Sequence, residues 1–184
     1  MPRHLKKISE ETLHQNPWWT YKHDKYQLPN GQIGDYYYGE TEGSVIMIPI
    51  LNDGRIVLTL QHRYLMDKQS IEFPCGAINQ GESSLNASMR ELKEETGCLA
   101  DIDNFIKIGE FESSNGLIKE RMHVYIVEVH TQIAPSQDET EDIEILYRRP
   151  DEIDEMIYKN EIWCGQTMAA WALAYRHFLY KGKL

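Results

Sequence analysis

Three glutamates near the middle of the chain have the spacing of a cation site. Glu91, Glu94 and Glu95 stand at i, i+3 and i+4, so on a helix of 3.6 residues per turn they share one face. Three carboxylates at such short separations repel one another unless a cation lies between them. Their hard oxygen atoms suit Mg²⁺ or Mn²⁺ rather than zinc. For an isolated pattern of this kind, the alternative is an ordinary surface helix with solvated glutamates.

The residues around these glutamates extend the pattern. Ser83-Ser84 can cap a helix that runs to about Thr96, and Gly97 is its stop signal. Arg90 can pair with Glu82 across the loop that precedes the helix. The whole pattern reads Gly76, five residues, Glu82, seven residues, Arg90-Glu91-Leu92, one residue, Glu94-Glu95, one residue, Gly97 and Cys98. These fixed offsets favour a metal site over a solvated surface helix.

The segment Gly76–Cys98 resembles the Nudix box, with Cys98 at its last aliphatic position, where a buried Cys behaves as a small hydrophobe. The resemblance implies a pyrophosphohydrolase with Mg²⁺ or Mn²⁺ as its cofactor. It implies that the carboxylates of Glu91 and Glu95 are the principal metal ligands. The carboxylate of Glu94 and the backbone carbonyl of Cys75 are the further ligands that it implies. It implies structural roles for the remaining box residues, which are Gly76, Glu82, Arg90 and Gly97.

Two segments at and before the start of the box indicate which subgroup of the family the chain resembles. Gln61-His-Arg63-Tyr64 and Ile71-Glu72-Phe73-Pro74-Cys75-Gly76 resemble a run found in ADP-ribose pyrophosphatases and related nucleotide-sugar hydrolases. The resemblance favours substrate-binding roles for Arg63 and Glu72. The residues alone leave Arg63 open as an inert surface side chain, and Glu72 as a member of a structural ion pair.

Two segments after the box also bear on the substrate. Asp138–Ile143 resembles the acidic loop of the same group, in which a glutamate, here Glu139, positions or deprotonates the attacking water. The predicted catalytic carboxylates are therefore Glu139, Glu94 and Glu91. Phe111–Gly116 lacks the proline that ADP-ribose pyrophosphatases typically carry beyond the box, which leaves other nucleoside-diphosphate sugars open.

The predicted reaction is metal-dependent hydrolysis of the pyrophosphate bond of a nucleoside diphosphate linked to a sugar. For ADP-ribose the products are AMP and ribose 5-phosphate. One alternative is a Nudix hydrolase of other nucleotides, such as dinucleoside polyphosphates, NADH or oxidised triphosphates. Another is a nucleotide-binding Nudix module without activity, against which the intact box argues.

Composition excludes several other classes. The 184 residues are 41% hydrophobic and 26% charged, as expected for a globular protein with a sizeable core. A net charge of −10 argues against nonspecific nucleic-acid binding. The three cysteines are widely spaced and odd in number, which fits a reducing cytoplasm. We find no signal-peptide pattern and no apolar run long enough for a membrane span.

The chain is predicted to contain both strands and helices. Residues 1–16 are polar and are expected to form a short helix or to remain loose. The predicted strands are 18–27, 33–38, 44–51, 55–63, 71–73, 105–111, 121–129 and 142–147. Turn signals at Pro29-Asn30-Gly31 and Asn52-Asp53-Gly54 predict hairpins. Beyond the box helix, helices are expected at 151–158, opened by Pro150, and at 165–180.

These elements predict an α/β fold with helices packed on a mixed sheet, and the resemblance implies the Nudix α/β/α sandwich. Residues 1–40 are expected to form an N-terminal β extension, and residues 41–184 the Nudix domain. The aromatics of the extension could stack a nucleobase, or pack in the core or in a dimer interface: Trp18, Trp19, Tyr36, Tyr37 and Tyr38. The subgroup's dimeric habit favours a two-fold homodimer.

Overall fold

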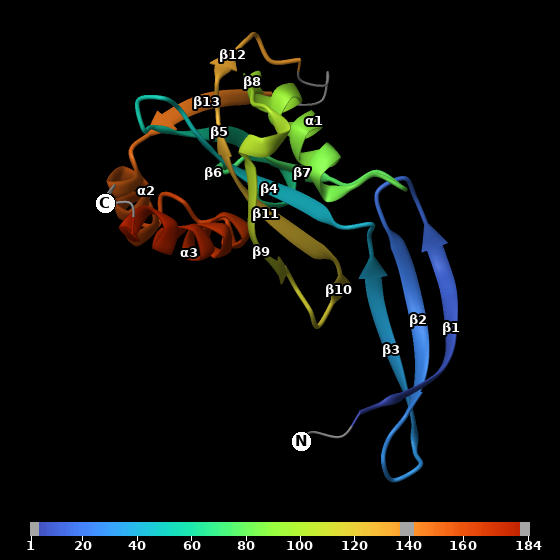
Figure 1. Ribbon diagram of the computed structural model, residues 1–184. Helices are drawn as coiled ribbons and strands as arrows, with labels where there is room; N and C mark the ends of the chain where they lie inside the picture. The colour runs from blue at the N-terminus through green and yellow to red at the C-terminus, as the bar shows by residue number, and fades with distance from the viewer. Residues whose placement is uncertain (1–3, 137–141, 181–184) are drawn as a thin grey trace. The chain divides into compact units, whose positions relative to one another are not determined.

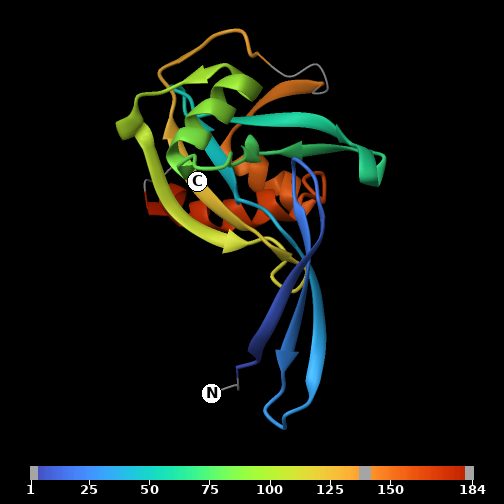
Figure 2. The ribbon, with the colours of Figure 1, turned by 90° about the vertical axis from the view of Figure 1, so that its right-hand side faces the viewer.

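The computed structural model describes residues 4–136 and 142–180, and the chain divides into two units (Figures 1 and 2). The N-terminal unit comprises Met1–Gly43 and Glu112–Arg121. The box unit comprises Ser44–Phe111 and Met122–Leu184. The predicted Glu139 lies outside the described residues.

The box unit is built on a mixed sheet with strand order β13-β5-β4-β11-β9, to which β6 and β7 add by pairing with β5 and β4. Strands β4 and β11 run parallel, whereas β5 is antiparallel to β4, β6 and β13. The strands are β4 Ser44–Ile50, β5 Ile56–Arg63, β6 Lys68–Glu72, β7 Cys75–Ala77, β9 Phe105–Glu112, β11 Arg121–Glu128 and β13 Ile143–Arg148.

The alternation of side chains along β4 gives this sheet two apolar faces. Val45 and Met47 join a core cluster with Leu92 of helix α1 (Ser84–Thr96). Ile46 and Ile48 join a second cluster with residues of helices α2 (Pro150–Tyr158) and α3 (Gly165–Tyr180). Both faces are buried because successive side chains of a strand point to opposite sides. Figure 1 shows α1 on one side of the sheet and α2 and α3 on the other, which confirms the predicted α/β/α sandwich.

The N-terminal unit is a second sheet of order β1-β2-β3-β10. Its strands are β1 Lys6–Gln15, β2 Thr20–Gln27, β3 Ile33–Glu40 and β10 Ile118–Lys119. The predicted β2–β3 hairpin is present, with register from Thr20↔Glu40 to Gln27↔Ile33. Strand β10 pairs in parallel with β3, so a segment far along the chain completes this sheet.

The expectation for residues 1–16 is wrong, because Lys6–Gln15 is strand β1. All ten of its residues are exposed, so no buried face imposes the alternation of apolar and polar residues by which a strand is recognised in a sequence. Pairing with β2, interrupted by two register shifts, holds the segment extended. Lys7 bonds Asp24 at 2.8 Å and Lys22 bonds Glu10 at 2.8 Å across the same pair of strands.

The other predicted elements are present with small shifts at their ends, and helices α2 and α3 begin at Pro150 and Gly165. Sequence reasoning missed β7, the short pair β8 (Cys98–Leu99) and β12 (Thr131–Gln132), and two 3₁₀ turns at Tyr64–Met66 and Ile102–Asn104. Within the described ranges, no helix combines the length and apolar character that crossing a membrane requires.

Candidate active site

Helix α1 carries the box carboxylates, and its two ends are fixed by local chemistry. The Ser83 hydroxyl accepts a hydrogen bond from the Asn86 amide at 3.2 Å, as an N-cap does. Gly97 ends the helix in the left-handed conformation with φ 68°. A Cβ on Gly97 would lie 2.0 Å from the Ile133 carbonyl oxygen. The predicted cap and stop signal are confirmed, and they set where each box glutamate lies on the helix.

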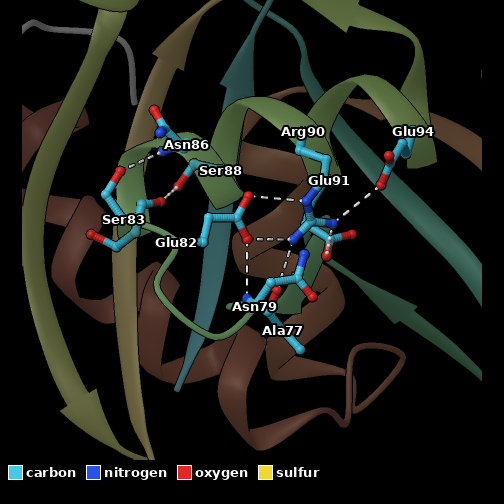
Figure 3. Close-up of polar contacts among 10 residues, drawn as sticks. Ala77, Asn79, Glu82, Ser83, Asn86, Ser88, Arg90, Glu91 and Glu94 are labelled. Atoms are coloured by element: carbon cyan, nitrogen blue, oxygen red, sulfur yellow. Dashed lines mark hydrogen bonds and ion pairs between the residues drawn. The ribbon is translucent and has the colours of Figure 1, made fainter. Parts of the chain in front are cut away.

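Arg90 fastens the loop before the helix onto the helix (Figure 3). Its guanidinium donates to Glu82 at 3.1 and 2.9 Å and to the Ala77 carbonyl at 2.9 Å. It also donates to Glu91 at 2.6 Å and to Glu94 at 3.2 Å. The predicted Arg90–Glu82 pairing is therefore present. Hydrogen bonds from Arg90 hold the pKa of the Glu82 carboxyl below its usual value.

Gly76 is required where the loop passes Glu91. A Cβ on Gly76 would lie 2.0 Å from Glu91 Cδ and 2.2 Å from its Oε1, closer than such atoms can approach. The backbone of β7 can therefore run against this carboxylate only because the residue has no side chain.

Glu95 faces the same loop from one turn further along the helix. The residue is 4% exposed, and its carboxylate accepts a hydrogen bond from the Cys75 amide at 3.1 Å. Burial raises the pKa of the Cys75 thiol well above its ordinary value, and the nearby carboxylates of Glu95 and Glu72 raise it further. A thiol kept protonated is a poor nucleophile, so the backbone of Cys75 is the part suited to the site.

Arg63 and Glu72 form a charged pair at the edge of the site. Arg63 Nε donates to Glu72 at 2.8 Å, and its Nη2 binds the other carboxylate oxygen. Glu72 is 2% exposed. Burial by itself raises the Glu72 pKa, but the hydrogen bond and charge of Arg63 outweigh it and lower the pKa below the usual value. The ion pair of Glu72 is therefore present, and its substrate-binding role stays a prediction.

A cavity of about 240 Å³ opens beside these groups. Its wall includes Arg63, Glu95 and the loop Cys75–Ala77, so it brings together the predicted substrate-binding arginine, a metal-ligand candidate and the box glycine. Four further lining residues were not predicted as site residues: Ser44, Gln61, Met122 and Gln166. Gln61 lies in a motif that the sequence marked, whereas nothing local marks Gln166.

A larger cavity, of about 510 Å³, lies within the N-terminal unit. Tyr26, Tyr36 and Tyr38 line it, and its Lys7 and Asp24 pair with each other at 2.8 Å. None of the box carboxylates is among its lining residues. The smaller cavity is therefore the candidate active site, because residues predicted for the site line its wall.

Family profiles match both parts of the chain. The profile of the NUDIX domain matches residues 41–169. This chain belongs to the Nudix family. A second profile, described as the nucleoside diphosphate sugar hydrolase N-terminal domain, matches residues 5–38. The predicted family and enzyme class, a Nudix pyrophosphohydrolase, are confirmed.

Individual relatives agree with the family. The Nudix chain is 30% identical over 149 residues to a methanol dehydrogenase activator of Bacillus methanolicus, covering 80% of each chain. It is 27% identical over 151 residues to an ADP-ribose pyrophosphatase of Bacillus subtilis (strain 168), covering 81% of this chain and 80% of the relative. A crystal structure described as an ADP compounds hydrolase has the same fold, with a TM-score of 0.85 at 18% identity over 99% and 98% of the two chains.

The Nudix box carboxylates fit the chemistry of a hard divalent cation. Glu91, Glu94 and Glu95 offer oxygen atoms only, the ligands that Mg²⁺ and Mn²⁺ prefer. Arg90 donates hydrogen bonds to two of these carboxylates, Glu91 and Glu94. Among the described residues, no three Asp, Glu, His or Cys side chains lie close enough together to hold a metal ion. Gly76 keeps the loop side of Glu91 free of a side chain. The metal-ligand and catalytic roles of these residues stay predictions.

Proposed function

We propose that this Nudix enzyme hydrolyses the pyrophosphate bond of a nucleoside diphosphate linked to a sugar, with ADP-ribose as the leading substrate. The match of residues 5–38 carries the proposal, because the matching domain is named for nucleoside diphosphate sugar hydrolases. The Bacillus subtilis relative, an ADP-ribose pyrophosphatase, supports it. The products of ADP-ribose hydrolysis are AMP and ribose 5-phosphate.

Acidic and basic residues of the box unit would have different roles in the reaction. Glu91, Glu94, Glu95 and the Cys75 carbonyl would hold Mg²⁺ or Mn²⁺, which when bound neutralises phosphate charge and activates water. The Arg63 guanidinium keeps donors beyond the two that Glu72 uses, and these can bind a phosphate oxygen. The Cys75 amide fixes the Glu95 carboxylate. We assign the acceptance of the water proton to Glu139 or to a box glutamate, Glu94 or Glu91.

The test is a panel of nucleotide sugars and other nucleotides incubated with the purified enzyme and Mg²⁺, with products separated by chromatography. We expect nucleoside monophosphate and sugar phosphate from nucleotide sugars, and no turnover in excess chelator until Mg²⁺ or Mn²⁺ is restored. Full activity in excess chelator would refute the metal dependence. Turnover confined to triphosphates or dinucleoside polyphosphates would refute the substrate class.

Hydrolysis of another nucleotide, such as NADH, is the second candidate. One observation favours it: the relative with 30% identity is named for activating a dehydrogenase. The missing proline in Phe111–Gly116 weakens only ADP-ribose and leaves other nucleoside-diphosphate sugars open. The same panel separates the two candidates.

We also propose that the enzyme is a cytoplasmic homodimer in which residues 1–40 contact the partner. Free thiols at all three cysteines support a reducing compartment. Large exposed hydrophobic side chains in the N-terminal unit support an interface there: Trp18, Trp19, Tyr21, Ile33, Tyr36 and Tyr37. The ring centroids of Trp19 and Tyr21 are 6.0 Å apart and those of Tyr21 and Tyr37 are 6.3 Å apart, so these three rings form a continuous apolar face.

A further inference from the structure

Two side-chain amides share the wall of the active-site cavity with Glu95 and Gly76. Gln61 lies near the end of β5, and Gln166 lies in the first turn of α3, far along the chain. Both residues are half-buried. Within the part of the chain that the structure describes, neither side-chain amide has a hydrogen-bond partner, whereas the neighbouring Glu95 and Arg63 side chains do.

The chemistry of an amide distinguishes what it recognises. Each Gln side chain offers two N–H donors and a carbonyl acceptor. A sugar hydroxyl also donates and accepts, so it can satisfy both halves of an amide. A phosphate oxygen only accepts, and the site already supplies Arg63 for it. The two amides therefore suit a neutral, hydroxyl-bearing part of the substrate rather than its pyrophosphate.

The size of the cavity fits the same assignment. At about 240 Å³ it is below the roughly 300–1,000 Å³ typical of pockets that enclose a whole drug-sized ligand. A cavity of this size can enclose one moiety of a nucleotide sugar but not the entire molecule. Glu95 lies in the wall of this cavity, so the enclosed moiety is one attached to the phosphates that the box carboxylates would serve.

We propose that Gln61 and Gln166 bind the hydroxyl groups of a sugar on the substrate and so determine specificity for sugar-linked pyrophosphates. The inference rests on the proposed function and adds the residues that would read the sugar. Two sugars of a nucleotide sugar carry such hydroxyls, the terminal sugar and the ribose of the nucleoside, and the experiment separates them.

The experiment compares wild type with Gln61→Met and Gln166→Met, which keep the approximate side-chain size and remove the hydrogen bonds. Each enzyme is assayed on ADP-ribose, on an ADP methyl ester that lacks the terminal sugar, and on an ADP-ribose analogue whose adenosine ribose lacks its 2′- and 3′-hydroxyls. We expect each substitution to lower kcat/KM for ADP-ribose about tenfold, mainly through KM, because the contact is made in ground and transition states alike.

The substrates then identify the sugar. If the amides bind the terminal sugar, the methyl ester will be hydrolysed equally well by wild type and variants. If they bind the ribose of the nucleoside, wild type and variants will instead hydrolyse the dideoxy analogue equally well. Gln69→Met is the matched control, because Gln69 is an exposed glutamine on the adjacent strand β6 and does not line the cavity.

Two results would overturn the inference while leaving the proposed function intact. One is equal loss of activity on all three substrates, which indicates a structural effect or a phosphate contact. The other is unchanged kinetics on ADP-ribose. A wild-type enzyme that hydrolyses no nucleotide sugar would overturn the proposed function, and the inference with it.

Discussion

At the residue scale, the charged pair of Arg63 and Glu72 combines a buried carboxylate with a partly exposed guanidinium. The Glu72 side chain is 3% exposed and that of Arg63 is 41% exposed. A buried carboxylate is tolerated because two hydrogen bonds from one guanidinium satisfy it. Removal of either partner leaves the other in an environment arranged for an opposite charge.

Arg63→Met is expected to lower the free energy of unfolding at pH 7 by about 1–3 kcal/mol, because it leaves the Glu72 carboxylate buried without its partner. In the wild type the Glu72 pKa is lowered, so the pair stabilises the fold above the usual carboxyl pKa of about 4.3 and loses this effect as the pH falls through the folded-state value. In the variant, burial alone raises the Glu72 pKa, so acidification protonates it first in the folded state.

The difference in stability between wild type and Arg63→Met should therefore shrink as the pH falls from 7 towards about 4. Urea unfolding at a series of pH values measures it. A difference that is constant over this range would show that Glu72 is not the group responsible.

Glu95→Gln is expected to lower turnover by more than the roughly 10²- to 10⁴-fold typical of a general acid–base group. The charge is removed where cation and phosphate charges meet, while the side-chain carbonyl of the introduced glutamine can still accept the Cys75 amide bond. Steady-state kinetics and thermal unfolding measure the two effects. Glu144→Gln, on an exposed site of β13, is the control. Turnover within about tenfold of wild type would contradict the metal-ligand role.

At the element scale, the contact between β7 and α1 depends on Gly76. We expect Gly76→Ala to reduce activity strongly and stability only slightly. The atoms that a Cβ would meet belong to the end of the flexible Glu91 side chain, which can move aside but then leaves its position in the site. Gly116→Ala is the matched control, because a Cβ there meets nothing within 4 Å.

Activity assays and thermal unfolding of both variants test this element. Wild-type kinetics in Gly76→Ala would show that the position of the Glu91 carboxylate does not matter for turnover. A large loss of stability would show instead that the added Cβ displaces the loop and not the Glu91 side chain.

At the scale of the whole molecule, the exposed hydrophobic side chains of the N-terminal unit predict self-association. Trp18 is 80% exposed, and large aromatics that become buried often carry most of the binding energy of an interface. We expect the wild type to sediment as a dimer at micromolar concentration. Trp18→Ser is expected to raise the dimer dissociation constant by about tenfold or more, and analytical ultracentrifugation measures it.

Tyr158→Ser is the control for general surface hydrophobicity, because Tyr158 is 91% exposed but lies on α2 of the box unit. It should leave the dimer unchanged. A wild-type protein that is monomeric at micromolar concentration and hydrolyses nucleotide sugars normally would contradict the dimer proposal.

Much of the candidate site was predictable because its determinants are local in the sequence. The i, i+3, i+4 spacing sets the helix face of Glu91, Glu94 and Glu95, and capping at Ser83 and Gly97 fixes the ends of that helix. The short apolar run of β4 likewise predicted a strand. Spacing, capping and apolar runs act within a few residues, so the sequence alone determines them.

Tertiary structure decided what depends on distant segments. Lys6–Gln15 is a strand because β2 pairs with it, and β10 joins the N-terminal sheet from far along the chain. The Arg63 side chain reaches Glu72 across the β5–β6 pair, although the register places Arg63 opposite Lys68 and Glu72 opposite Thr59. Gln61 and Gln166 line one cavity because α3 packs on the sheet. No local sequence pattern predicts these contacts, because each arises from pairing and packing between different segments. The number of residues between two segments does not determine how far apart they lie in the folded chain.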